Sequence, residues 1–196
     1  MIAADAVAVV LLAAGRSTRF GARDKLAEPL AGLPLGLHAA RMLRDIPFAA
    51  HIAVTRPGGP DFARYGFATV INGDPGAGQS ASIALGLAEA RLARPKAVLI
   101  ALADMPFVTR AHVEALLANH DEEHPVVAST GGALPCPPAL FGAAMFDTLA
   151  RLSGDAGARA LLRSAALVAA PSAELADIDT PADLPPDGGA SDGRPA

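Results

Sequence analysis

The stretch VVLLAAGRSTRFGARDKL, residues 9–26, decides the fold, because an apolar run passes directly into a loop rich in cations. The run over residues 7–12 lacks polar alternation, which is typical of a strand buried on both faces of a parallel sheet. Gly15 and Gly21 then bracket a loop, and glycine permits the backbone conformations that wrap a phosphate chain. The stretch predicts a buried strand that delivers an anion-binding loop to one edge of a sheet.

Two cations of this loop fit a phosphate-binding role better than the others. Lys25 can reach a phosphate as a point charge, and Arg16 can bind one through two parallel hydrogen bonds. Arg19 and Arg23 have weaker claims. No Gly-Lys-Ser/Thr follows, so the loop is not a P-loop. An exposed loop with solubilising charges explains the same composition, so the loop alone leaves both interpretations open.

The alternation of short apolar runs and longer helical segments continues along the chain. Strands are predicted at residues 51–55, 68–72, 97–102, 125–129 and 166–170. Helices are predicted after Pro34 and at about 80–94, 109–120 and 138–163, and Thr109 can cap the third of these helices. This alternation predicts an α/β domain with a parallel sheet covered on both sides. Ligands bind beyond the carboxyl ends of such strands, so the loops that begin at Ala13, Asn72 and Ala103 are expected on one edge.

Composition narrows the class of protein further. The 196 residues suit one domain, and Cys136 is the only cysteine, so no intrachain disulfide forms. A net charge of -4 gives no general field for nucleic acid, and no apolar run approaches the roughly 18–20 residues of a membrane-spanning helix. The beginning of the chain carries Asp5 and lacks a positive segment, unlike a signal peptide. A soluble cytoplasmic protein without nucleic-acid or membrane partners is expected, with a disordered tail over residues 185–196.

The segment NGDPGAGQSASIALGL, residues 72–87, predicts a glycine-rich turn at the start of a helix. Ser80 or Ser82 is the predicted N-cap, so free backbone N–H groups would face a ligand. GAGQSA formally fits the dinucleotide fingerprint, but it follows the third predicted strand, and no acidic residue ends the next strand at the expected distance. The segment predicts nucleotide contact through backbone and serine hydroxyls, with a merely capped helix as the alternative.

Carboxylates follow the buried strand over 97–102 and recur near the end of the ordered chain. Asp104 is predicted at the ligand edge, where a hard carboxylate suits a Mg²⁺ ion that also holds phosphates, although Asp is also a common turn residue. Asp177 and Asp179 can reach the same metal. Thr180 and Pro181 also make a good helix start, which explains this second segment as well.

Two further patterns carry less weight. HDEEH at residues 120–124 fits an inverted zinc-protease motif, but Pro125 follows at once, so a solvated, charged helix end is expected instead. Cys136 lies among prolines without His and Asn partners, so no nucleophilic role is expected.

Five ordered blocks together resemble the nucleotidyltransferase family that builds molybdenum cofactor dinucleotides, most closely its cytidylyltransferases. The blocks are LAAGRSTRFGARDKL with LAGLPL, GQSASIALGL, LADMPFVT, PALFGAAMFDTLARLSGDAGARALL and DIDTPADL. The resemblance implies one domain over residues 1–184, nucleotide-binding to about residue 108 and acceptor-binding beyond it. It also implies a three-layer, Rossmann-like, glycosyltransferase-A-like fold with a mostly parallel central sheet covered by helices on both faces.

The resemblance also implies roles for individual residues. Lys25, Asp104 and Arg16 would be catalytic, with Arg16 and Lys25 on the triphosphate. Asp104 would bind Mg²⁺ together with Asp177 or Asp179, and the choice between these two stays open. The remaining nucleotide-binding residues would be Leu12, Ala13, Ala14, Gly15, Gly78, Ser80 and Ser82. Acceptor-binding residues would be Gly154, Asp155, Gly157 and Arg159, although a helix break with a capped restart also explains this segment.

The implied reaction transfers CMP from CTP to the phosphate of a molybdopterin-type cofactor and releases pyrophosphate, with a molybdoenzyme or its maturation chaperone as the expected receiver of the product. Ala14 resembles the cytidylyl branch, where the guanylyl branch carries glycine, but such a size filter is worth only about 1–3 kcal/mol. Cys136 and Pro137 stand where the family often has glycine and histidine, which leaves the acceptor open. The alternatives are a guanylyltransferase, transfer to another phosphorylated acceptor, and a molybdopterin delivery chaperone, which would need neither Lys25 nor Asp104.

Overall fold

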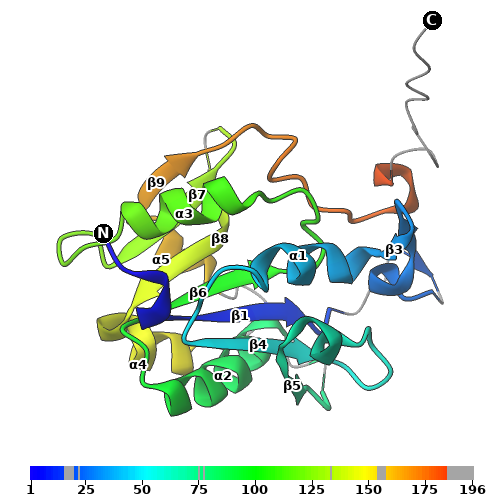
Figure 1. The fold of residues 1–196 in the computed structure, drawn as a ribbon, viewed down its shortest axis with the longest axis horizontal. Coiled ribbons are helices and arrows are strands. Elements are labelled where there is room, and N and C mark those ends of the chain that lie inside the picture. Colours follow the sequence, from blue (N-terminus) through cyan, green and yellow to red (C-terminus); the bar gives the residue numbers. More distant parts are fainter. Residues whose placement is uncertain are drawn as a thin grey trace, which may run out of the picture.

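The structure is a computed structural model that describes residues 1–15, 20–21, 23–74, 76, 78–132, 134–153 and 158–184. Its main sheet has seven strands in the order β5-β4-β1-β6-β8-β7-β9 (Figure 1). These strands are β1 (Val7–Ala13), β4 (Ala50–Thr55), β5 (Ala68–Ile71), β6 (Ala97–Leu102), β7 (Val126–Thr130), β8 (Pro135–Gly142) and β9 (Ala166–Ala169). A small separate sheet pairs β2 (Pro29–Leu30) with β3 (Leu33–Pro34).

The main sheet is mostly parallel, as predicted. β1 pairs in parallel with β4 and β6, β4 with β5, and β7 with β9, whereas β8 runs antiparallel to both β6 and β7. The parallel strands β1, β5 and β6 therefore end at one edge, which confirms the predicted common edge for the loops after Ala13, Asn72 and Ala103. We call this the ligand edge.

One predicted element is wrong. The helix expected over residues 138–163 is replaced by β8, followed by the separate short helices α4 (Phe146–Ala150) and α5 (Arg159–Leu162). Residues 138–142 are all buried because β8 lies between β6 and β7, and the apolar run resembles a helix and an interior strand equally well.

Helices cover both faces of the sheet (Figure 1). β1 alternates its side chains between them. Val7, Val9 and Leu11 pack with α1 (Leu35–Leu43) and α3 (Arg110–Ala118), whereas Ala8, Val10 and Leu12 pack with α2 (Gln79–Ala90), α4 and α5. This arrangement confirms the three-layer α/β fold, with β1 at the centre of both cores.

The short helices mark chain turns. They are η1 (Ala4–Ala6), η3 (Lys25–Ala27), η4 (Phe62–Tyr65), η6 (Arg91–Ala93), η7 (Ala143–Met145) and η8 (Pro181–Asp183). Thr109 caps α3 as predicted, since its hydroxyl oxygen accepts from the His112 N–H. The chain leaves α3 at Ala118 and enters β7 at Val126, so HDEEH does not lie on a continuous helix.

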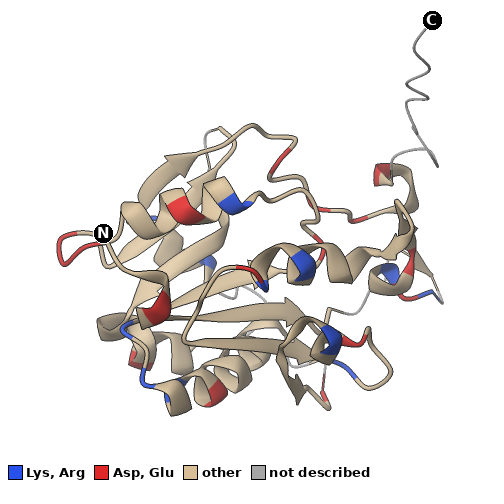
Figure 2. Cartoon of the chain, in the orientation of Figure 1, with Lys and Arg blue, Asp and Glu red and all other residues tan. Residues whose placement is uncertain are grey.

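Figure 2 shows Lys and Arg (blue) and Asp and Glu (red) scattered over the helices and loops of the described chain. Within the described parts of the chain, no group of three or more His, Cys, Asp or Glu side chains is arranged to hold a metal ion by itself. No helix among the described residues is long and apolar enough to cross a membrane.

Candidate active site

A single lysine joins two acidic segments at the ligand edge. The Lys25 Nζ lies 2.6 Å from Oδ2 of Asp104 and 3.1 Å from Oδ1 of Asp179. It also donates to the backbone carbonyl of Ile178 at 3.1 Å. Lys25 is only 8% exposed. Two residues predicted separately, Lys25 and Asp104, are thus parts of one partly buried ion cluster of Lys25, Asp104 and Asp179, which we call the Lys25 cluster.

The electrostatics of the cluster keep Lys25 charged. Burial acts to lower its pKa, but the neighbouring carboxylates of Asp104 and Asp179 outweigh burial and raise the pKa above its ordinary value. Lys25 is therefore a charged ammonium group near neutral pH, and in this structure it lies between the two carboxylates.

The backbone near Lys25 is fixed by residues that sequence analysis missed. Asp24 caps η3, because its Oδ1 accepts from the Leu26 N–H at 3.1 Å. The same oxygen lies 2.7 Å from Nη2 of Arg56, which directly follows β4. The ion pair connects the segment that carries Lys25 to the end of β4. The position of Arg56, immediately after a predicted strand, was the signal available in the sequence.

The structure separates the two aspartates that sequence analysis left as alternatives. The Ile178 N–H donates to the Asp104 carbonyl at 2.9 Å, which aligns the segment over 177–179 with the end of β6. Asp179 then faces Lys25, whereas Asp177 lines a neighbouring cavity. Asp183 holds the turn beyond, since its Oδ2 accepts from the backbone N–H groups of Asp179 and Thr180.

The start of α2 differs from the prediction. The helix begins at Gln79, and its N-cap is Gly78 rather than Ser80 or Ser82. Gly78 has a φ of +83°, a conformation that favours glycine. Both serines are buried, and Ser82 Oγ accepts from the Asn72 side-chain amide at 2.9 Å. Sequence analysis missed Asn72, which links the end of β5 to α2.

The other predicted nucleotide-binding residues lie at the end of β1. Leu12, Ala13 and Ala14 are buried, and Gly15 is exposed at the ligand edge. Arg16 lies outside the described residues.

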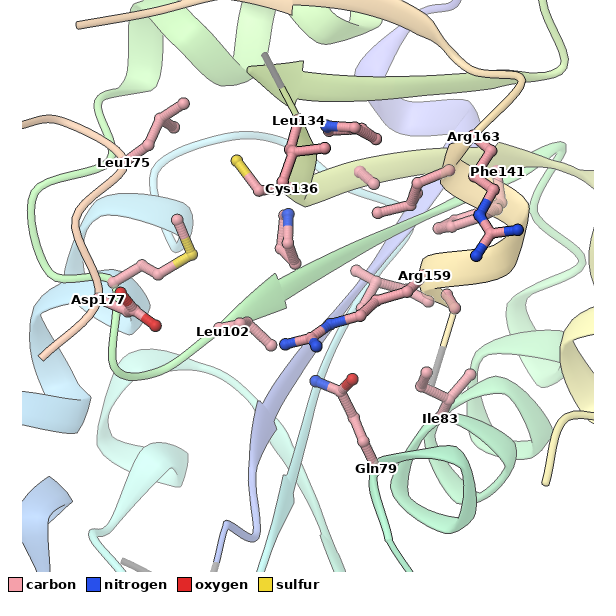
Figure 3. Close-up of a pocket in the computed structure, with 17 residues that line it drawn as sticks. Gln79, Ile83, Leu102, Leu134, Cys136, Phe141, Arg159, Arg163, Leu175 and Asp177 are labelled. Carbon is pink, nitrogen blue, oxygen red and sulfur yellow. The ribbon is translucent and has the colours of Figure 1, made fainter. Parts of the chain in front are cut away.

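A cavity of about 520 Å³ opens between α2, β6, β8 and α5. Its floor is apolar, and its polar lining comes from Gln79, Cys136, Arg159, Arg163 and Asp177. Figure 3 shows the Arg159 and Gln79 side chains pointing toward one another, with Asp177 on the far side of the cavity. We call this space the β8 cavity.

The β8 cavity contains one of the predicted acceptor residues, Arg159. Gly154, Asp155 and Gly157 lie outside the described residues, as does the predicted tail over 185–196. Gln79 and Arg163 were missed, because they come from separate elements, the start of α2 and the end of α5, which only the folded chain brings to one cavity. Burial raises the pKa of the Cys136 thiol, which favours its unreactive neutral form.

Comparison with known proteins supplies a family. The profile of the MobA-like NTP transferase domain matches residues 9–170. Purine catabolism protein PucB of Bacillus subtilis (strain 168) is 32% identical over 189 residues, covering 88% of this chain and 91% of PucB.

Solved structures share the fold. Rv0371c from Mycobacterium tuberculosis H37Rv superposes with a TM-score of 0.73 at 23% identity, covering 90% of this chain and 95% of that one. A second structure of Rv0371c is a complex with manganese, with a TM-score of 0.70, 22% identity and coverage of 84% of this chain and 88% of that one. Molybdopterin-guanine dinucleotide biosynthesis protein A from Archaeoglobus fulgidus gives a TM-score of 0.63 at 22% identity, with 90% and 94% covered. With its Lys25 cluster at the ligand edge of a matching fold, this chain belongs to the MobA-like NTP transferase domain family and is a nucleotidyltransferase.

Proposed function

We propose that this nucleotidyltransferase transfers CMP from CTP to the terminal phosphate of a molybdopterin-type cofactor and releases pyrophosphate. The observation that supports the proposal is the placement of the Lys25 cluster on the ligand edge, next to the β8 cavity. Asp177, two residues before Asp179 of the cluster, lines that cavity. The name of the Archaeoglobus fulgidus relative supports a molybdopterin-type acceptor.

The residues of the Lys25 cluster fit a divalent metal ion. Carboxylate oxygens of Asp104 and Asp179 converge on one position that already holds a cationic group, and hard oxygen donors suit Mg²⁺. We assign Asp104 and Asp179 as its ligands and Asp177 to the acceptor side. When bound, the ion supplies charge that stabilises the phosphates during displacement.

The other residues act by position and charge. An oxygen of the acceptor phosphate forms a bond to the α-phosphorus of CTP in line with the bond to the leaving pyrophosphate, which breaks. Lys25 and Arg16 balance the charge of the pyrophosphate, and Arg159 orients the acceptor phosphate. A phosphate monoester is largely ionised at neutral pH, so no protein base is needed. The enzyme forms no covalent intermediate.

The choice of CTP rests on Ala14, whose buried methyl group lies just after β1. A methyl group at the place where the base approaches disfavours a larger purine, by about 1–3 kcal/mol. CTP is therefore the preferred donor over GTP.

Pyrophosphate release tests the proposal. CTP, GTP, ATP and UTP are each supplied with Mg²⁺, with and without molybdopterin. We expect release that requires molybdopterin and is fastest with CTP. Asp104→Asn should nearly abolish it, whereas Asp5→Asn, an exposed carboxylate in η1, serves as the matched control.

Three results would contradict the proposal. Near-normal release by Asp104→Asn would remove the proposed metal chemistry. Faster release with GTP would assign a guanylyltransferase. Tight molybdopterin binding without release under any nucleotide would favour a delivery chaperone.

A further inference from the structure

We propose that Lys25 occupies, in the nucleotide-free protein, the position between Asp104 and Asp179 that the divalent metal takes when nucleotide is bound. The metal then binds tightly only after the phosphates of the nucleotide have drawn the Lys25 ammonium away. This inference rests on the proposed function and adds to it an obligatory coupling between metal and nucleotide.

A metal ion at this site would compete with Lys25 for the same carboxylate oxygens. The Lys25 Nζ lies 2.6 Å from Asp104 Oδ2 and 3.1 Å from Asp179 Oδ1. A Mg²⁺ ion bound to the same oxygens lies about 2.0–2.1 Å from each. An ion that took these oxygens would meet the charge of the Lys25 ammonium, whose side chain is only 10% exposed, and the two cations would repel each other.

Lys25 does not leave this position easily. Its Nζ also donates to the Ile178 carbonyl, so departure breaks a hydrogen bond as well as two ion pairs. The backbone at its base is fixed through Asp24 and Arg56. The free protein is thus a poor metal site, although it presents two carboxylates.

A nucleotide changes this balance because its triphosphate offers Lys25 a new anionic partner on the same edge of the sheet. The four-carbon stem of lysine is flexible, so the ammonium can move without a change in the backbone. The carboxylates of Asp104 and Asp179 can then bind the metal in place of the ammonium. Because binding free energies are coupled reciprocally, bound metal must tighten nucleotide binding by the same factor.

The test uses Mn²⁺ alone as the probe, with free Mn²⁺ measured by electron paramagnetic resonance and no nucleotide present. We expect Lys25→Met to bind Mn²⁺ at least tenfold more tightly than the wild-type protein. Lys96→Met is the matched control, because Lys96 is exposed, precedes β6 at the opposite edge, and is the only other lysine in the chain. Adding Asp104→Asn to Lys25→Met should abolish the gain.

A second measurement uses the wild-type protein and so does not depend on the variant's folding. With ¹³C-labelled lysine, NMR gives one set of signals for Lys25 and one for Lys96. We expect Mn²⁺ alone to leave the Lys25 signal unbroadened, and Mn²⁺ with a non-hydrolysable CTP analogue to shift and broaden it.

Equal Mn²⁺ affinity of wild-type and Lys25→Met proteins, or broadening of the Lys25 signal by Mn²⁺ alone, would overturn the inference. Pyrophosphate release by the wild-type protein is unaffected by that outcome, so the proposed function would stand. Absence of release with every nucleotide, despite tighter Mn²⁺ binding by Lys25→Met, would overturn the proposed function and leave the competition between Lys25 and metal intact.

Discussion

Arg56 joins the end of β4 to the segment that carries Lys25, through an ion pair with Asp24. Its ion pair with Asp24 is 2.7 Å long, and the two side chains are 29% and 16% exposed, so solvent weakens it less than an ordinary surface pair. We expect Arg56→Met to lower kcat/KM for pyrophosphate release about tenfold, because Lys25 loses its fixed base, a change of roughly 1.4 kcal/mol. Steady-state kinetics against Arg64→Met, an exposed arginine on η4, measure this. Equal losses in both variants would contradict a positioning role.

Asp177 and Asp179 provide a second comparison at the same scale. Asp179 contacts Lys25, whereas Asp177 lines the β8 cavity. We expect Asp179→Asn to lower kcat at least about a hundredfold, as removal of a charge-stabilising group does, and Asp177→Asn to raise mainly the KM for the acceptor. Kinetics with each substrate varied in turn separate the two effects. The reverse pattern would exchange their roles.

These residues also show how far sequence analysis reaches. Lys25 and Asp104 were each predicted from local chemistry, but they lie 79 positions apart, and nothing local indicates that they form an ion pair. The choice of Asp179 over Asp177 depends on one backbone hydrogen bond, from Ile178 to Asp104. Such contacts arise only when the whole chain has folded.

Helix α2 approaches the sheet more closely than any side chain at Gly86 would permit. A Cβ at Gly86 would lie 2.3 Å from Val10 Cγ1 and 2.9 Å from Val54 Cγ2. Alanine favours helices over glycine by about 1 kcal/mol, but the clash costs typically 1–3 kcal/mol. We therefore expect Gly86→Ala to lower the free energy of unfolding, measured by urea denaturation. Adding Val10→Ala should recover part of the loss relative to Val10→Ala alone, and full additivity would contradict the clash.

Strands with a clear apolar run, and the helix with a clear N-cap residue, were predicted well. β1, β4, β5, β6, β7, β9 and the Thr109 cap of α3 all lie where the sequence indicates. β8 was missed because an interior strand and a buried helix share the same apolar composition. The α2 N-cap was misplaced because the turn at Gly78 places the helix start before Ser80 and Ser82. Both serines are buried, and Ser82 bonds to the Asn72 side chain instead of capping the helix.

At the scale of the whole molecule, two histidines make the free energy of unfolding depend on pH: His112, which is buried, and His120, which is half-buried. His112 Nε2 lies 2.7 Å from Ser129 Oγ, which itself donates to the Pro138 carbonyl, so Nε2 carries a proton and donates it to Ser129. Burial lowers the pKa of His112, although the Glu174 carboxylate opposes this, and burial likewise lowers the pKa of His120.

A lowered pKa means that the unfolded chain binds protons more readily than the folded protein below about pH 6.5. The two neutral histidines therefore stabilise the folded protein fully above that pH. This stabilisation is lost as the pH falls toward their lowered pKa values. We expect the free energy of unfolding to decrease from pH 7.5 to pH 5.5, and His112→Gln to reduce this slope. A slope that His112→Gln does not alter would contradict the assignment.

The reversed direction of β8 has a consequence for how this molecule can change. The strands β5, β4, β1 and β6 bring their carboxyl ends to the ligand edge, whereas β8 brings its beginning there, with Pro135, Cys136 and Pro137 lining the β8 cavity. The Lys25 cluster therefore lies where parallel strands end, and the start of the reversed strand helps to line the neighbouring cavity. Under the proposed function, replacing residues at the start of β8 would change which acceptor fits the β8 cavity and leave the contacts of Lys25 and Asp104 in place. Donor activation and acceptor choice would then be separable traits of one sheet.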